Sequence, residues 1–115
     1  MRTWAVMFLG VVLSACSVTQ PVVVITDRGQ TLRGSATATL SGGSFSATDG
    51  QLTCSGAYDS LSLEKTITMP ARCSDGRKGI VIATRDSSGQ SGHGIIQMSD
   101  GTKGTFIFGP SAANF

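Results

Sequence analysis

The chain of 115 residues is long enough for a single domain, and its composition is turn-rich: 15 residues are glycine and only 14 % are charged. Downstream of residue 15, eight Lys or Arg residues are balanced by seven Asp or Glu residues, so the net charge is about +1. This balance lacks the basic footprint of a nucleic-acid-binding protein, and no nucleic-acid partner is expected.

One small basic cluster lies in the second half of the chain. Two carboxylates interrupt it, which favours an ordinary solvated surface and leaves an anion or lipid-headgroup site as the alternative. The cluster consists of Arg72, Arg77, Lys78 and Arg85, and the two carboxylates are Asp75, within it, and Asp86, directly after Arg85.

The first sixteen residues, MRTWAVMFLGVVLSAC, are organised like an export signal. Arg2 supplies a minimal positive region, and an apolar run of ten residues follows from Trp4 to Leu13. That length fits the core of a signal peptide and is too short to span a bilayer as a stable helix. Residues 1–15 are therefore predicted to be a signal peptide.

The apolar run ends in Leu13-Ser14-Ala15-Cys16, which resembles the lipobox of bacterial lipoproteins. The resemblance implies that the Cys16 thiolate receives a diacylglyceryl group, and that signal peptidase II recognises Leu13, Ser14 and Ala15 and cuts before Cys16. The lipid at Cys16 would then anchor the protein to a membrane of the cell envelope. The same resemblance implies that Ser17 after the cysteine favours the periplasmic face of the outer membrane in a Gram-negative host.

Two other interpretations of the leader stay open. It could be an ordinary secretory leader that is cleaved near Ala15 and leaves Cys16 as a free thiol. It could also be the apolar N-terminus of a cytoplasmic protein.

The three cysteines fit the lipoprotein interpretation. If Cys16 carries lipid, Cys54 and Cys73 are left as one pair, and export to an oxidising compartment favours a disulfide between them. Two buried free thiols are the alternative. Two cysteines nineteen residues apart and one distant histidine do not make a metal-ligand set, so no metal and no cofactor are expected.

The part after the leader is predicted to be all-β, because apolar alternation and turn signals recur about every ten residues and no amphipathic helix is evident. We expect a small antiparallel β-barrel or sandwich. The expected organisation is a lipidated cysteine and tether at 16–20, a β domain at 21–110 and a C-terminal tail at 111–115. The expected strands are 21–26, 31–40, 44–48, 51–58, 61–69, 79–85, 94–98 and 102–108.

Several details of these strands can be tested. Residues 61–69 alternate most cleanly, which places Leu61, Leu63, Ile67 and Met69 on one face, and Pro70 is expected to end that strand. The apolar run at 79–85 predicts burial on both faces or a central place in the sheet. The Asp49-Gly50 hairpin signal predicts a type I′ turn, with positive φ at both residues.

The segments 75–82 and 100–107 share the pattern D-G-x-K-G-x-apolar-Ile with an offset of twenty-five residues. With Gly92-His93-Gly94, the second copy faintly resembles a MORN repeat, which would imply stacked hairpins. The alternative is that each Asp-Gly pair is an ordinary hairpin turn.

No catalytic residues are predicted, and the protein is not expected to be an enzyme. His93 is the only histidine and lies between two glycines, which favours an exposed turn over a catalytic base. The expected function is a structural or interaction role in the envelope, with an envelope protein or glycan as partner. The alternative is a ligand-binding or hydrolase-inhibitor barrel. An enclosed apolar pocket would favour a ligand carrier, and a filled interior would favour a scaffold.

Overall fold

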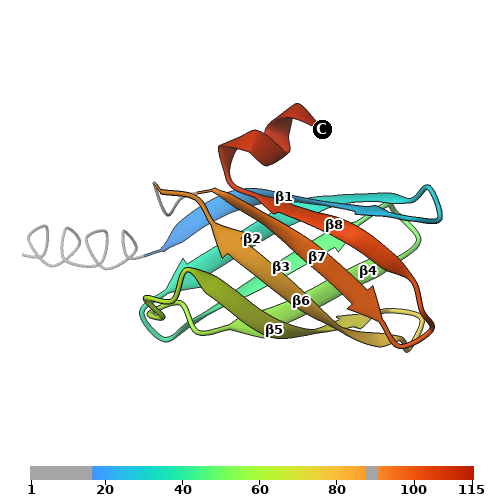
Figure 1. Ribbon diagram of the computed structural model, residues 1–115, viewed down its shortest axis with the longest axis horizontal. Coiled ribbons are helices and arrows are strands. Elements are labelled where there is room, and N and C mark those ends of the chain that lie inside the picture. The colour runs from blue at the N-terminus through green and yellow to red at the C-terminus, as the bar shows by residue number, and fades with distance from the viewer. Residues whose placement is uncertain (1–16, 88–90) are drawn as a thin grey trace, which may run out of the picture.

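The computed structural model describes residues 17–87 and 91–115, so residues 1–15, predicted to be a signal peptide, and Cys16 lie outside the described residues. The described chain forms eight antiparallel strands and one short 3₁₀ helix. Figure 1 shows the strands wrapped around a common axis. The strands are β1 (Val18–Thr26), β2 (Thr31–Thr39), β3 (Gly42–Thr48), β4 (Thr53–Tyr58), β5 (Thr66–Cys73), β6 (Lys78–Arg85), β7 (Gly92–Met98) and β8 (Lys103–Phe108).

Each strand pairs with the next one along the chain, and β8 returns to pair with β1. In this closing pair Val22 lies opposite Phe108 and Thr26 lies opposite Gly104. The all-β prediction is confirmed, and the ring closure decides for a barrel over a sandwich. Closure also removes the free strand edges that an open sheet would expose. In the part of the chain that the structure describes, no helix is long and apolar enough to cross a bilayer.

Alternation along the strands places one set of side chains inside the ring. The largest fully buried side chains on this inner face include Leu32, Val81 and Phe106. Phe45 packs edge-to-face on Phe106 with ring centroids 5.0 Å apart, which is a favoured aromatic geometry. On the inner face of β4, Cys54 is buried and Tyr58 packs against the core.

Glycines opposite aromatic residues give the rings room along the inner wall. Gly43 pairs with Tyr58, and Gly56 pairs with Phe45. A Cβ added at Gly43 would lie 2.4 Å from the Tyr58 ring, and one added at Gly56 would lie 2.6 Å from the Phe45 ring. Both rings therefore lie over bare backbone on the neighbouring strand, and any larger residue at either glycine would push them inward.

The predicted strand at residues 61–69 is wrong in its bounds. β5 begins at Thr66 and continues through Pro70 to Cys73, while Leu61 and Leu63 lie in the preceding loop and are exposed. Proline is tolerated because β4 pairs only with Ala71–Cys73 of β5. Pro70 thus lies where one edge of the strand has no partner and needs no N–H there.

Of the two expectations for residues 79–85, burial on both faces is wrong, whereas a place inside the sheet is confirmed, because β6 pairs with β5 on one side and β7 on the other. β6 alternates, with Val81 facing the interior and Ile80 and Ile82 on the outer wall. Ile82 pairs with Ile95 of β7, which is also exposed, so the three isoleucines form an apolar strip on the outside of the barrel. A barrel wall has only one interior face, and continuous hydrophobicity in one strand cannot reveal which residues point outward.

Both ends of the described chain are more ordered than the sequence indicated. Residues 18–20, expected in the tether, pair with β2 and form the start of β1. At the other end, Pro110–Asn114 form the 3₁₀ helix η2, which lies over β1 and β8 (Figure 1). Ala112 of this helix is buried against Val23 and Ile107 on the outer wall.

The type I′ prediction for Asp49-Gly50 is wrong. Gly50 has a φ of 97°, but no described residue other than glycine has a positive φ. The Asp49 carboxylate instead accepts the backbone N–H groups of Gln51 and Leu52 at 2.9 and 2.8 Å. In the turns that join β1 to β2, β5 to β6 and β7 to β8, one glycine also has a positive φ: Gly29, Gly76 and Gly101, respectively.

The predicted disulfide between Cys54 and Cys73 is present, and the two residues lie directly opposite each other on β4 and β5. The bond closes a loop with a sequence separation of 19. On the chain-entropy account, the Cys54→Ala/Cys73→Ala variant should lose about 3 kcal/mol of unfolding free energy. Urea unfolding of the oxidised protein, the reduced protein and the double variant measures this loss. Equal stability of all three would contradict the prediction.

Candidate functional site

The two ends of the barrel differ in chemistry. One end, on the right in Figure 1, carries the turns that join β1 to β2, β3 to β4, β5 to β6 and β7 to β8. The other end carries the start of β1, the β2–β3 turn, the β4–β5 loop and the end of β8. We call these the closed end and the mouth, and each is a candidate for a site.

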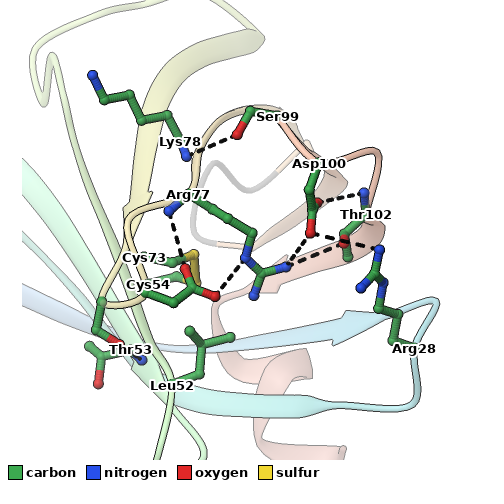
Figure 2. A network of polar contacts seen from close by, with 12 residues as sticks. Arg28, Leu52, Thr53, Cys54, Cys73, Arg77, Lys78, Ser99, Asp100 and Thr102 are labelled. Carbon is green, nitrogen blue, oxygen red and sulfur yellow. Dashed lines mark hydrogen bonds and ion pairs between the residues drawn. A yellow bond between two sulfur atoms is a disulfide. The ribbon is translucent and has the colours of Figure 1, made fainter.

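A polar network joins three turns of the closed end. The Arg77 guanidinium donates from Nε to Asp75 Oδ2 at 2.7 Å, and from Nη1 to Asp100 Oδ2 at 3.1 Å and Thr102 Oγ1 at 3.3 Å. Arg28, from the β1–β2 turn, lies 3.7 Å from Asp100 Oδ2. Figure 2 shows these side chains converging beside the Cys54–Cys73 disulfide.

The polar groups of this network hydrogen-bond to one another. The other oxygen of Asp100 accepts the backbone N–H of Thr102 at 2.9 Å. Hydrogen bonds from Thr102, together with Arg77, hold the pKa of Asp100 at about 2, below its ordinary value of 3.8. Thr102 itself is buried. The cluster therefore links the turns of the closed end to one another. Across residues 17–87 and 91–115, no group of His, Cys, Asp and Glu side chains could hold a metal ion.

The mouth opens into a cavity of about 450 Å³ within the barrel. This volume falls within the range of roughly 300–1,000 Å³ that small-molecule sites occupy. Its deepest walls are the buried side chains of Phe45, Met69 and Phe106, with half-buried Ile67 and Phe108 nearer the opening. A cavity with such walls suits an apolar body.

Small residues at inward positions leave this space empty. Ala36 and Ala38 of β2 and Ala83 of β6 line the cavity, where leucine or isoleucine would fill it. At the closed end, larger side chains such as Leu32, Leu52 and Met98 occupy the interior instead. The barrel is therefore packed at one end and hollow at the other.

A few polar groups line the cavity beside these apolar walls. They are Gln20, Tyr58, Ser60, Ser62 and Arg85. Burial raises the pKa of the Tyr58 hydroxyl, and the charge of Arg85 lowers it by less, so the phenol keeps its proton at neutral pH. The cavity thus offers a neutral hydroxyl and a cation to the polar part of a bound molecule.

The β4–β5 loop is fastened on both sides of the mouth. On one side the Ser60 hydroxyl donates to the backbone carbonyl of Thr39 at the end of β2. On the other, Arg85 Nη1 donates to the Ser62 carbonyl and the Arg85 backbone N–H donates to the Lys65 carbonyl, each at 2.9 Å. These bonds give a loop that has no strand partner a defined position beside the cavity.

The structure separates the residues that the sequence analysis singled out. Leu13, Ser14, Ala15 and Cys16 lie outside the described residues. Cys54 and Cys73 are joined at the closed end. His93 is exposed on β7, paired with Thr84 and Ile107, and does not line the cavity. The basic cluster is divided, with Arg77 at the closed end and Arg85 at the mouth, at opposite ends of β6.

Sequence reasoning missed the cavity and its polar groups. The available signal was the alternation in β2, where Ala36 and Ala38 occupy the inward positions that other strands fill with Phe45, Met69 or Phe106. Small residues at successive inward positions indicate unfilled volume in a barrel. That signal becomes usable only once the barrel and its inward face are known.

Comparison with protein-family profiles, curated proteins and solved structures finds no match to this chain.

The closed-end network predicts a pH dependence of stability. Because the pKa of Asp100 in the folded protein is about 2, below its ordinary value of 3.8, its contribution is complete above pH 3.8 and is lost as the pH falls toward 2. Asp100→Asn should lower the thermal unfolding midpoint at pH 7. Between pH 3.8 and pH 2 the midpoint of this variant should fall less than that of the wild type. Asp27→Asn, which removes the same charge from a neighbouring turn, is the control. Parallel pH profiles for the wild type and Asp100→Asn would argue against the network.

Proposed function

We propose that this protein is a lipid-anchored component of the cell envelope that binds an apolar or amphipathic small molecule in the cavity at its mouth. The observation that carries the proposal is the cavity of about 450 Å³ with apolar walls, in a barrel that is otherwise packed. Binding without chemical conversion is the simplest use of such a cavity, and His93 lies away from it on the outer wall.

The cavity supports a carrier over a pure scaffold. Eight-stranded barrels have an interior that side chains either fill or leave open for one small ligand. Here Leu32, Leu52 and Met98 fill the closed end, whereas Ala36 and Ala38 leave the mouth hollow. An unfilled apolar interior forgoes the packing that would stabilise the fold, and a bound ligand replaces that packing.

The lining indicates the chemistry of the ligand. Phe45, Phe106 and Met69 suit an aliphatic or aromatic body, and the Tyr58 hydroxyl can donate or accept one hydrogen bond. The Arg85 guanidinium carries several N–H donors, so it can hold the β4–β5 loop and meet an anionic group as well. The proposed ligand is therefore an amphiphile with one polar or anionic end.

The anchor is proposed from the lipobox resemblance at residues 13–16. The Cys54–Cys73 disulfide supports export, because structural disulfides persist in oxidising compartments outside the cytoplasm. Cys16 then remains as the unpaired cysteine, as a lipidated residue would be. In a Gram-negative host we propose the periplasmic face of the outer membrane.

A second candidate is an interaction role with an envelope protein or glycan. The observation in its favour is the exposed strip of Ile80, Ile82 and Ile95 on the outer wall. Exposed apolar residues that adjoin on one face are more typical of contact surfaces than single scattered ones. This role is compatible with ligand binding, because the strip and the cavity lie on opposite sides of the barrel wall.

Filling the cavity tests the binding proposal. Ala38→Phe should weaken the binding of a dansylated fatty acid by about tenfold or more, because the new ring occupies the space of the ligand. Ala57→Phe is the matched control, since Ala57 is exposed on the outer face of β4. Fluorescence titration of both variants, with circular dichroism to verify folding, measures the difference. Undiminished binding by Ala38→Phe would rule out this cavity as the site.

The anchor is tested separately at Cys16. In the native host, Cys16→Ser should accumulate as the uncleaved precursor and should not incorporate a palmitate analogue, because no thiol is available for the lipid. Gel mobility and labelling with an alkyne-tagged palmitate measure both effects. Labelling at the wild-type level in Cys16→Ser would refute the lipobox interpretation.

A further inference from the structure

The rim of the mouth carries large apolar side chains that no other part of the described chain covers. Val18 at the start of β1 is 59 % exposed, Leu40 in the β2–β3 turn 72 %, and Leu61 and Leu63 in the β4–β5 loop 62 % and 97 %. Every exposed leucine among residues 17–87 and 91–115 belongs to this set. Three separate segments thus bring apolar side chains to one end of the barrel.

The rim and the cavity form one continuous apolar surface. Val18, Leu61 and Leu63 line the cavity as well as being exposed. The Ser60 and Arg85 hydrogen bonds fix the loop that carries the two leucines, so their outward position is built into the fold. The closed end has the opposite character, with Arg28, Arg77 and Asp100 exposed or partly exposed in its turns.

The position of the proposed lipid anchor indicates which partner covers this rim. Only Ser17 separates Cys16 from Val18, where β1 begins. Two residue steps of extended chain span at most about 7 Å, so a lipid on Cys16 enters the bilayer beside the mouth. With so short a tether the mouth faces the membrane surface, while the charged closed end faces water.

We propose that the mouth lies against the bilayer that holds the anchor, with Leu40, Leu61 and Leu63 in the membrane interface, and that the cavity takes an acyl-chain amphiphile directly from that bilayer. This inference rests on the proposed anchor and deepens the proposed binding function. Insertion is shallow, because the polar ends of Asp59, Glu64 and Lys65 in the same loop lie among the lipid headgroups and do not enter the acyl chains. The ligand then moves between two apolar phases without crossing water.

A single tryptophan at the rim tests this orientation. Both variants are made in the full chain with Trp4→Phe, so that each protein carries one tryptophan. Leu63→Trp places this tryptophan on the rim. Ile80→Trp places it on the outer wall and is the control. Both positions are exposed aliphatic residues, so both variants should fold. Each protein is purified with its native N-terminus and reconstituted in phosphatidylethanolamine–phosphatidylglycerol vesicles whose acyl chains are brominated near the headgroup.

We expect bromolipid to quench the Leu63→Trp emission about threefold more than the Ile80→Trp emission, since interfacial insertion reaches roughly 5–10 Å into the headgroup boundary. Equal weak quenching at both positions would overturn the proposal. A blue-shifted Leu63→Trp emission without quenching would also overturn it, because a second copy of the chain would then cover the rim.

Two measurements on the same samples separate this inference from the proposed function. Mass spectrometry reports acylation at Cys16, and the dansylated fatty acid reports cavity binding. Acylated, ligand-binding protein with an unquenched rim tryptophan refutes only the orientation. Absence of acylation refutes the anchor and this inference together, while cavity binding is judged by its own titration.

Discussion

The pairing of β8 with β1 is the constraint on which the rest of the structure depends. It converts a simple meander into a ring, and a ring of eight strands encloses a fixed interior. Side chains must then share a set volume, and their sizes decide where it is filled. An open sheet of the same strands would have neither a cavity nor a defined mouth, and its edges would be free to pair with another chain.

Within that ring, residue size and polarity divide the barrel into two halves. The closed end has bulky apolar side chains, a disulfide and a salt-bridged cap, so covalent, packing and electrostatic terms all stabilise the same region. The mouth has alanines inside and leucines outside, the reverse of the order expected for stability alone. Such a local conflict with stability is typical of a functional site.

The sequence was a good guide to the fold and a poor one to the site. Alternation and Asp-Gly turns predicted eight antiparallel strands, since these signals are local. Whether Leu61 and Leu63 belonged to a strand could not be predicted, because their spacing mimics the alternation of β5, and their position depends on Ser60 and Arg85 bonding to distant backbone. The continuation of β5 through Pro70 likewise could not be predicted, because it depends on β4 pairing with only the last three residues of β5.

The cavity was hidden for a related reason. Ala36 and Ala38 are ordinary strand residues until the ring shows that they line the same cavity as Phe45 and Phe106. The disulfide was predictable because it needed only the cysteine count and the expectation of export. The Arg77 network could not be predicted, because it joins turns that are twenty or more residues apart in the sequence. These turns meet only when the ring closes.

The short pairing between β4 and β5 has a mechanical consequence. Only three residue pairs join these strands, and the one farthest from the mouth, Cys54 with Cys73, is also linked covalently. Any separation of the two strands must therefore start at the mouth and stop at the sulfur bridge. The disulfide therefore keeps the two strands joined at the closed end, and the seam between them is least constrained where it reaches the mouth.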